Sequence, residues 1–410
     1  MKPKKIIQYI VLMVVVFLFS GIKIHAEPIK EIETIKEVQI GKQENDQLEG
    51  NEQDILSYGM ELIDWQSIKN LEEELAYALP DDVSFDVKQE MENLISGKSK
   101  FSLEQILSFI LKILIGEMGV FIQFGARFIL VVLLCNLLQT LSTSFKSKEI
   151  TKVAFFVCYM VILLSVVQSF KIMIDLSMTL IDQVTRVMMV CIPILLAFMA
   201  TSGLNLSAGA MAPVIISALH IMTYLMKIIL LPCIISVVVL EVMNAMSQEI
   251  KVDKLIGLFY KWIKWALVTI LSISMGLLGL YRLTLPGVDM TLKKATLKLS
   301  GVFLPVVGKS INETVDFVAQ CAMVIKNTFA GSVMIFILMV VSIPMIKILS
   351  YTIIYEVASA VIEPIGDKKM ASIAAKLSKG CKCVMSCVGI IVLFSLASLM
   401  ICMTITASGL

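Results

Sequence analysis

The chain has 410 residues, of which 58% are hydrophobic and 17% are charged, and its mean hydropathy is +0.88. Soluble domains contain about 45–50% apolar and about 25% charged residues, so this composition excludes an ordinary soluble protein. The formal net charge of +2 hides an asymmetry, because residues 27–100 carry 19 acids and 7 lysines, a net of −12. Lysines in the remainder collect beside apolar segments, which is typical of a membrane protein. No basic cluster interleaved with aromatic residues is present, which argues against nucleic-acid binding.

The first 26 residues have the pattern of a secretory signal peptide. A basic start from Met1 to Lys5 precedes an apolar stretch from Ile6 to Ile22, and Ala26 supplies the small residue that a signal peptidase prefers. We expect cleavage after Ala26, with a retained membrane anchor as the alternative. In both cases the segment that follows is exported.

The exported segment divides into two parts. Residues 27–54 are acidic and lack aromatic residues, so we expect them to be disordered. Residues 55–118 are predicted to form a short helical extracytoplasmic region: apolar residues recur at helical spacing over 55–79 and 84–96, and Ser102 and Gln105 form a capping box. The simpler interpretation is an ectodomain on the bilayer surface, and the alternative is a docking element for another envelope protein.

Residues 119–410 are predicted to be a polytopic transmembrane domain, which makes the fold class all-α. Residues 300–323 contain Lys309, Glu313 and Asp316 and could be re-entrant, interfacial or spanning, so about 8–10 transmembrane or re-entrant helices are expected. The nine apolar spans lie at approximately 119–141, 153–170, 187–203, 210–226, 228–247, 265–281, 329–346, 348–364 and 383–407.

The charges of the loops test this topology. With the N-terminal region outside, the lysine-rich loops 142–152 and 248–264 fall inside, as the positive-inside rule requires. The lysine-rich loop 365–382 then falls outside, against the rule. An extra crossing within 300–323 would bring it inside, but the basic residues of 282–299 remain outside in either version. The topology of the second half is therefore left open.

Two stretches share one plan. Residues 210–247 and 329–364 are each apolar runs that contain prolines and are interrupted by a central lysine, Lys227 or Lys347. We expect two ordinary helical hairpins with a lysine at each turn. The alternative is a pair of broken helices around a site at the membrane midplane, which is the pattern of secondary transporters.

Ionisable residues inside the spans are the candidate site residues, because a charge at a helix centre costs about 2.5–3.5 kcal/mol on insertion scales. Glu356 is the leading candidate, and Glu363 lies on the same helix face seven residues later. Either glutamate could line a polar path or pair with Lys347 or Arg127 across helices. Glu241 is expected near the inner edge of its span.

The sequence offers little for an enzyme or a metal site. Only His25 and His220 are present, and neither a phosphate-binding P-loop nor a GxGxxG dinucleotide motif occurs. Cys381, Cys383 and Cys387 have a spacing that matches no standard zinc pattern. We therefore predict no catalytic, metal or cofactor-binding residue.

Several short motifs resemble those of the stage III sporulation protein AE family, and together they cover nearly the whole chain. They are Lys152-Val153-Ala154, Tyr159-Met160-Val161, Gln168-Ser169-Phe170, Ile192-Pro193-Ile194-Leu195-Leu196-Ala197, Ser202-Gly203, Asp289-Met290-Thr291-Leu292, Phe303-Leu304-Pro305-Val306-Val307-Gly308, Lys326-Asn327-Thr328, Ile343-Pro344, Ile346-Lys347-Ile348-Leu349-Ser350, Ile354-Tyr355 and Glu363-Pro364-Ile365-Gly366.

The resemblance implies a non-enzymatic membrane component of the channel that joins the mother cell to the forespore and is needed after engulfment. It implies partners encoded in the same operon: a predicted ATPase, a secretion-type membrane protein and ring-forming proteins, together with a forespore channel protein. It places the chain in the mother-cell (outer forespore) membrane, with the ectodomain in the intermembrane space. The alternative function, from the residues alone, is a stand-alone secondary transporter with its site between the two proline-interrupted hairpins.

Overall fold

The computed structural model describes residues 59–61, 63–76, 85–96, 103–144, 148–246, 252–303, 307–365 and 368–405. Within these residues the regular secondary structure is helical and no strand is present, which confirms the all-α fold class. The predicted signal peptide (1–26), the acidic segment (27–54) and the first residue of the capping box, Ser102, lie outside the described residues.

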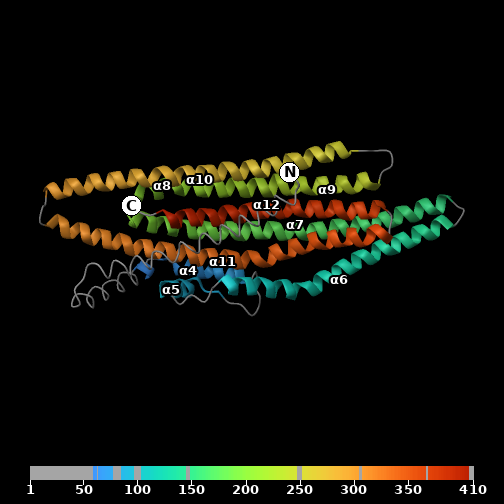
Figure 1. The fold of residues 1–410 in the computed structure, drawn as a ribbon, viewed down its shortest axis with the longest axis horizontal. Helices are drawn as coiled ribbons and strands as arrows, with labels where there is room; N and C mark the ends of the chain where they lie inside the picture. Colours follow the sequence, from blue (N-terminus) through green and yellow to red (C-terminus); the bar gives the residue numbers. More distant parts are fainter. Residues whose placement is uncertain are drawn as a thin grey trace.

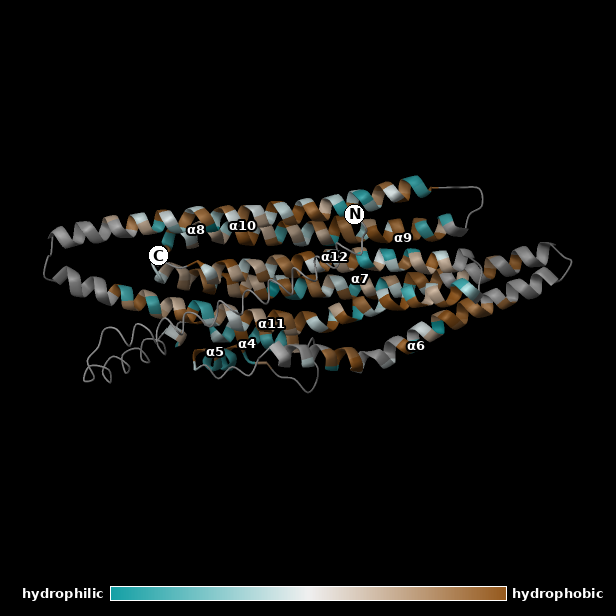
Figure 2. Ribbon diagram, in the orientation of Figure 1, coloured by the Kyte–Doolittle hydropathy of each residue, from teal (hydrophilic) through white to brown (hydrophobic). Residues whose placement is uncertain are grey.

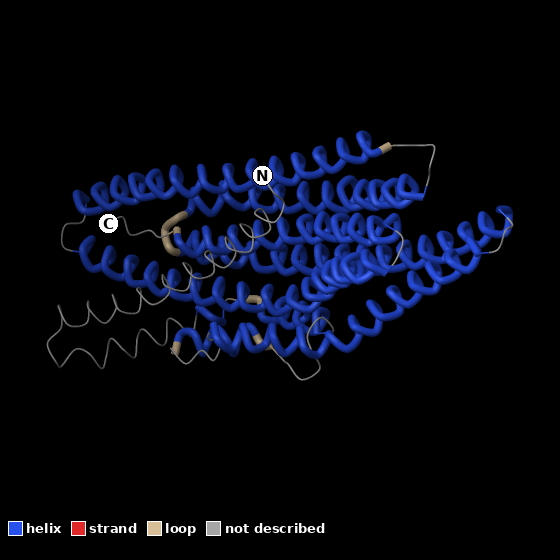
Figure 3. Tube along the Cα trace, turned by 45° about the vertical axis from the view of Figure 1, so that its right-hand side comes forward, coloured by secondary structure: helices blue, strands red, loops and turns tan. Residues whose placement is uncertain are grey.

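Long helical rods lie side by side, and each is antiparallel to the one before it (Figure 1). Figure 3 shows the same arrangement after a turn of 45°. The short helices α4 (Trp65–Leu75) and α5 (Val87–Ile95) lie against the rods. The rods are α6 (Leu103–Ser144), α7 (Lys148–Thr201), the continuous rod of α8 (Asn205–Tyr224), η2 (Leu225–Leu230) and α9 (Leu231–Met246), α10 (Asp253–Phe303), α11 (Val307–Ile365) and α12 (Lys368–Thr404).

The rods join segments that the sequence analysis treated as separate spans. α7 contains both 153–170 and 187–203, and the stretch between them continues the helix. The two predicted hairpins are wrong, because the chain does not reverse direction at Lys227 or at Lys347. Residues 300–323 are not a separate crossing either, since they are divided between the end of α10 and the start of α11.

The physical reason is that a charge lowers hydropathy without breaking a helix. Lysine is a good helix former, so Lys227 and Lys347 interrupt an apolar run and leave the helix intact. Pro213 and Pro344 lie inside their helices, where neighbouring helices make proline tolerable within a membrane. Between 171 and 186 the sequence contains no glycine and no proline, so nothing there ends α7.

Among the residues that the structure describes, five helices are long and apolar enough to cross a bilayer, which supports a multi-pass membrane protein. They are Leu163–Thr201, Asn205–Asn244, Asp253–Leu292, Val315–Pro364 and Ala371–Thr404, and α6 adds the shorter apolar segment Gly125–Leu134. A helix of 40 residues such as Asn205–Asn244 is about 60 Å long at 1.5 Å per residue. The hydrocarbon layer is about 30 Å thick, so these rods extend well beyond it. Hydrophobic residues predominate along the shared middle of the rods (Figure 2).

The antiparallel order brings the lysine-rich segments to one end of the bundle. The end of α6, the start of α10 and the start of α12 lie together at the right of Figure 1. These helix ends adjoin the three segments that the sequence analysis identified, 142–152, 248–264 and 365–382. If each rod crosses once, all three satisfy the positive-inside rule without an extra crossing in 300–323. This end of the bundle is therefore expected to face the cytoplasm.

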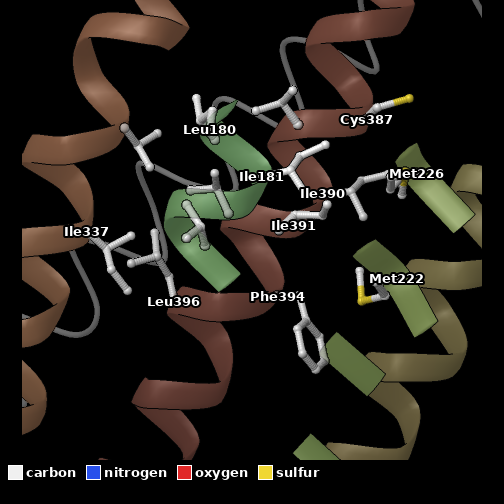
Figure 4. Packing of buried hydrophobic residues seen from close by; sticks show 14 of the residues in the cluster. Leu180, Ile181, Met222, Met226, Ile337, Cys387, Ile390, Ile391, Phe394 and Leu396 are labelled. Atoms are coloured by element: carbon white, nitrogen blue, oxygen red, sulfur yellow. The ribbon is translucent and has the colours of Figure 1, made fainter. Parts of the chain in front are cut away.

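Helix α12 lies at the centre of the bundle. Its apolar window is 67% buried, whereas that of α10 is 22% buried, so α10 lies at the periphery. Figure 4 shows how the core is built: Ile391 and Phe394 of α12 lie among Ile181 of α7, Met222 of α8 and Ile337 of α11. All five side chains are almost completely buried. The described residues thus share one continuous core.

Gly380 allows α12 to approach its neighbours closely. A Cβ atom at this position would collide with Val238 of α9 and lie 3.0 Å from Phe170 Cζ of α7. We expect Gly380→Ala to destabilise the protein by about 1–3 kcal/mol, the usual range for overpacking a well-filled core. Thermal unfolding of the purified protein in detergent measures this change. Gly389→Ala on the same helix is the control, because its Cβ would meet nothing within 4 Å. An equal loss of stability in both variants would contradict the explanation.

The N-terminal helices pack against the rods, not merely on a bilayer surface as the sequence interpretation expected. Phe85 stacks on Phe336 of α11 with 5.7 Å between ring centroids, and Glu74 forms an ion pair with Arg186 of α7. Ile68, Leu71, Leu75, Val87 and Met91 are buried and belong to the same core as the rods. The two helices are therefore an integral part of the bundle.

Candidate functional site

An ion pair joins α7 to η2 midway along the two rods, on one side of the bundle. Lys227 Nζ donates hydrogen bonds to both carboxylate oxygens of Asp182, at 2.8 Å each. Asp182 is midway along the candidate span Leu163–Thr201, and Lys227 is close to the middle of Asn205–Asn244. The side chains are 43% and 27% exposed, so the pair is accessible from one side of the bundle. A half-exposed pair of charges at this depth is the strongest candidate for a functional group.

The local backbone at Lys227 is unusual. Leu225–Leu230 form a π-helical turn within an otherwise α-helical rod. Such turns are rare and are found frequently at functional sites. One turn before Lys227, the hydroxyl groups of Thr223 and Thr185 lie 3.0 Å apart and form a second polar contact with α7. The π-turn and these two contacts together fix the position of Lys227 against α7.

Sequence reasoning missed Asp182, because it placed 171–186 in a connection between two spans. The spacing of the charged residues in that stretch was the available signal: Lys171, Asp175, Asp182 and Arg186 recur on one side of a helix. Lys227 was noticed only as the centre of a predicted hairpin.

Glu356, the leading sequence candidate, pairs with a different residue from those expected. It forms an ion pair with Lys382 of α12, whereas Lys347 and Arg127 had been considered as its partners. Its side chain is 50% exposed, so the pair joins α11 to α12 at the surface of the bundle. Glu363 and Arg127 are also exposed, and Lys347 is half-buried on α11. None of the ion pairs among the described residues joins two of the four sequence candidates Glu356, Glu363, Arg127 and Lys347.

Glu241 is part of a contact among three helices at the lysine-rich end of the bundle. It is 4% exposed, and its Oε2 accepts a hydrogen bond of 2.7 Å from the hydroxyl of Tyr260 on α10. Lys379 Nζ of α12 lies 3.5 Å from Glu241 Oε1 and 3.5 Å from the centroid of the Tyr260 ring. Because each group of this cluster has a partner within it, we interpret the cluster as a clamp that holds α9, α10 and α12 together.

Two further buried polar residues cap helix ends. Asp289 of α10 is 5% exposed and accepts hydrogen bonds from Leu206 N at 2.9 Å and from Ser207 N at 2.8 Å. The hydroxyl of Ser207 donates a third bond of 2.5 Å to the same carboxylate. Lys326 of α11 is completely buried, and its Nζ donates to the carbonyl oxygen of Ile405 at the end of α12. Both side chains satisfy backbone groups that a helix terminus leaves without partners.

Metal binding finds no support among the residues that the structure describes. They contain no group of three or more His, Cys, Asp or Glu side chains placed to hold a metal ion. Cys381 and Cys387 are buried in the core of the bundle.

Comparison with known proteins now assigns the family. The family model described as "Stage III sporulation protein AE" matches residues 85–407. The chain belongs to the stage III sporulation protein AE family. One relative is the Bacillus subtilis (strain 168) protein named "Stage III sporulation protein AE", which is 27% identical over 318 residues, or 77% of this chain and 79% of that protein. No solved structure matches this chain.

The structure explains several of the motifs that resemble the AE family, because they meet in space. Ser169 of the Gln168-Ser169-Phe170 motif forms a buried hydrogen bond with Tyr355 of the Ile354-Tyr355 motif. Asp289 caps the helix that begins just after Ser202-Gly203, where Gly203 has a φ of 88° that favours glycine. These contacts join α7 to α11 and α8 to α10.

Proposed function

We propose that this protein is a non-enzymatic membrane component of the channel complex that connects the mother cell with the forespore after engulfment. The observation that carries the proposal is the AE family match, which covers both the N-terminal helix α5 and all the long rods. A multi-pass bundle that carries a partly exposed ion pair, Asp182 with Lys227, midway along its rods supports a role in passage across a membrane. The stand-alone transporter alternative rested on paired hairpins and on Glu356. Both stretches are continuous helices, and Glu356 pairs with Lys382 at the surface of the bundle, so we prefer the channel component.

The proposal includes partners and a location. The protein works with the ATPase, the secretion-type membrane protein, the ring-forming proteins and the forespore channel protein expected from the family. It resides in the mother-cell (outer forespore) membrane, with α4 and α5 in or next to the intermembrane space. The lysine-rich end of the bundle then faces the mother-cell cytoplasm, in agreement with the positive-inside rule.

Deletion of the gene in the organism that encodes this chain tests the proposal. We expect normal vegetative growth, completed engulfment and a loss of heat-resistant spores, and we expect a second copy of the gene to restore them when it is expressed in the mother cell. Counts of heat-resistant spores and fluorescence microscopy of the forespore membranes measure these outcomes. Normal spore counts in the deletion strain, or restoration only by expression in the forespore, would contradict the proposal.

A further inference from the structure

One side of α7 carries a row of polar side chains. Lys171, Asp175, Thr179, Asp182 and Arg186 are spaced by three or four residues, so they share one side of the helix. All are exposed except Asp182, which is half-exposed. We call these five residues the α7 polar face. It is about 22 Å long at 1.5 Å per residue, most of the thickness of a hydrocarbon layer of about 30 Å.

Helix α10 indicates where the bilayer begins on the lysine-rich side. Trp262 and Trp265 are 55% and 66% exposed, and tryptophan prefers the membrane–water interface. From there to Leu280 the large exposed side chains of α10, including Val268, Ile273 and Leu277, are apolar, as expected for a surface that contacts lipid. The apolar surface therefore begins near Trp265 and runs toward the far end of α10.

Contacts across the bundle place the α7 polar face at the same depth as this apolar surface. Tyr260, just before the two tryptophans, is bonded to Glu241 of α9. Val238, about one turn before Glu241, and Phe170 of α7 are the side chains that a Cβ added at Gly380 would meet, so both lie beside this glycine. Phe170 is thus near the level of the tryptophans, and the α7 polar face extends from there into the membrane.

Two of the charges on the α7 polar face lack partners. Asp182 pairs with Lys227, and Arg186 pairs with Glu74. Among the residues that the structure describes, neither Lys171 nor Asp175 takes part in an ion pair. Lys171 follows Phe170 at the level of the tryptophans, where charges are hydrated, and Asp175 lies about 6 Å deeper. Charged groups at membrane depth face protein or water and not lipid, so we expect another surface to cover α7 from Asp175 inward.

We propose that a second copy of this chain covers the α7 polar face, with the two copies parallel in the bilayer and related by a two-fold axis along the membrane normal. Lys171 and Asp175 are four residues apart, about 6 Å along the helix axis, an offset that the long lysine side chain can span. The two-fold axis lets Lys171 of each copy pair with Asp175 of the other, which satisfies all four charges. An apolar partner or lipid would offer these charges no counter-ion beyond each other, at the i, i+4 spacing of one helix.

The pairing itself is argued independently of the proposed function. Its consequence for transport rests on that function and deepens it. Two copies joined through α7 enclose a row of charged and hydroxyl groups that includes the Asp182–Lys227 pair. The α7 polar faces of the two copies then form a polar surface that lies within the membrane and is enclosed by protein. This chain would then line part of the path for small polar solutes and water in the channel complex, in addition to any contacts that it makes with the other components.

Cysteine cross-linking tests the pairing without reference to sporulation. Thr179→Cys is introduced into a variant in which the nine native cysteines are replaced, and the protein is expressed in a host without other sporulation proteins. We expect a short bifunctional maleimide to produce a dimer band from membranes. Leu277→Cys, exposed on the lipid-facing side of α10, is the matched control and should remain monomeric. Cross-linking of both variants, or of neither, would overturn the proposal.

Charge exchange separates the proposed pairing from simple proximity. Asp175→Lys places like charges opposite each other and should lower the cross-linked fraction of Thr179→Cys severalfold. Adding Lys171→Asp restores opposite charges and should restore the dimer, while membrane levels of the protein confirm that each variant is inserted. Dimer formation that is unchanged by Asp175→Lys, or a cross-link that appears only in sporulating cells and contains a different protein, would also overturn the proposal. Loss of spore formation with an intact dimer would count against the proposed function alone.

Discussion

Replacing Asp289 with alanine is expected to destabilise the protein by about 2–4 kcal/mol, because it removes the cap of α8 and leaves buried backbone donors without acceptors. The carboxylate accepts hydrogen bonds from Leu206 N, Ser207 N and Ser207 Oγ, and it is 5% exposed. Without this acceptor, the first turn of α8 loses these hydrogen bonds to α10, and the turn between α7 and α8 could change its conformation. Thermal unfolding of the purified protein in detergent measures the effect.

Two further variants are expected to lose less stability than Asp289→Ala. Asp289→Asn retains one carbonyl acceptor, so its loss of stability should be smaller than that of Asp289→Ala. Ser207→Ala removes only the hydroxyl donor and leaves both backbone bonds to Asp289, so it should have the smallest effect of the three. An Asp289→Ala protein as stable as the parent would show that the cap does not hold α8 in place.

Breaking the Asp182–Lys227 pair is expected to have the second large effect. Lys227→Met leaves the Asp182 carboxylate without its counter-ion midway along α7. Removing one partner of a buried pair costs about 3–5 kcal/mol, and the partial exposure of this pair lowers the expected loss to about 1–2 kcal/mol. Heat-resistant spore counts should fall as the stability of the protein falls. They should fall by more than the loss of stability explains if the pair takes a direct part in the passage of solutes across the membrane.

A double-mutant cycle isolates the interaction. The variant that carries both Asp182→Asn and Lys227→Met has no uncompensated charge, so it should lose less stability than the sum of the two single variants. If that double variant folds normally but still fails to form spores, the pair itself is required for function. If the effects of the two single changes on stability are strictly additive, the two charges do not interact, and the Asp182–Lys227 ion pair contributes nothing to the stability of the fold.

Sequence patterns predicted the class of this fold well. The composition and apolar blocks indicated an all-α polytopic membrane protein, and helical spacing located the two short N-terminal helices that became α4 and α5. These predictions succeed because hydropathy and helical periodicity are local properties. The tight packing of α4 and α5 on the rods could not be predicted, since it depends on contacts such as Phe85 with Phe336 between distant parts of the chain.

The division into spans failed for a physical reason. Hydropathy windows end a span at a charge, but Lys227 and Lys347 fit within a helix, and the charges between 171 and 186 lie on one side of α7. A helix continues through such residues when the opposite side packs in the core, as Leu180, Ile181 and Val184 do. The periodicity of the charges was the better indicator of structure in this stretch than their number.

The candidate site was predicted in part. Glu241 was identified from the sequence, and the structure places it in a buried contact with Tyr260. The partner of Glu356 was predicted wrongly, because α12 brings Lys382 beside it. Such pairings depend on how the rods are ordered around the bundle, which a single sequence does not reveal.

The side of the membrane reached by the end of α7 tests the central claim, that each rod crosses the bilayer once. Thr201 is exposed at this helix end, and Ser372 is exposed near the lysine-rich end of α12. In a cysteine-free background, Thr201→Cys in intact cells should react with a membrane-impermeant maleimide added outside, whereas Ser372→Cys should react only after the membrane is permeabilised. Separate spans at 153–170 and 187–203 would place Thr201 inside, so protection of Thr201→Cys in intact cells would contradict this account.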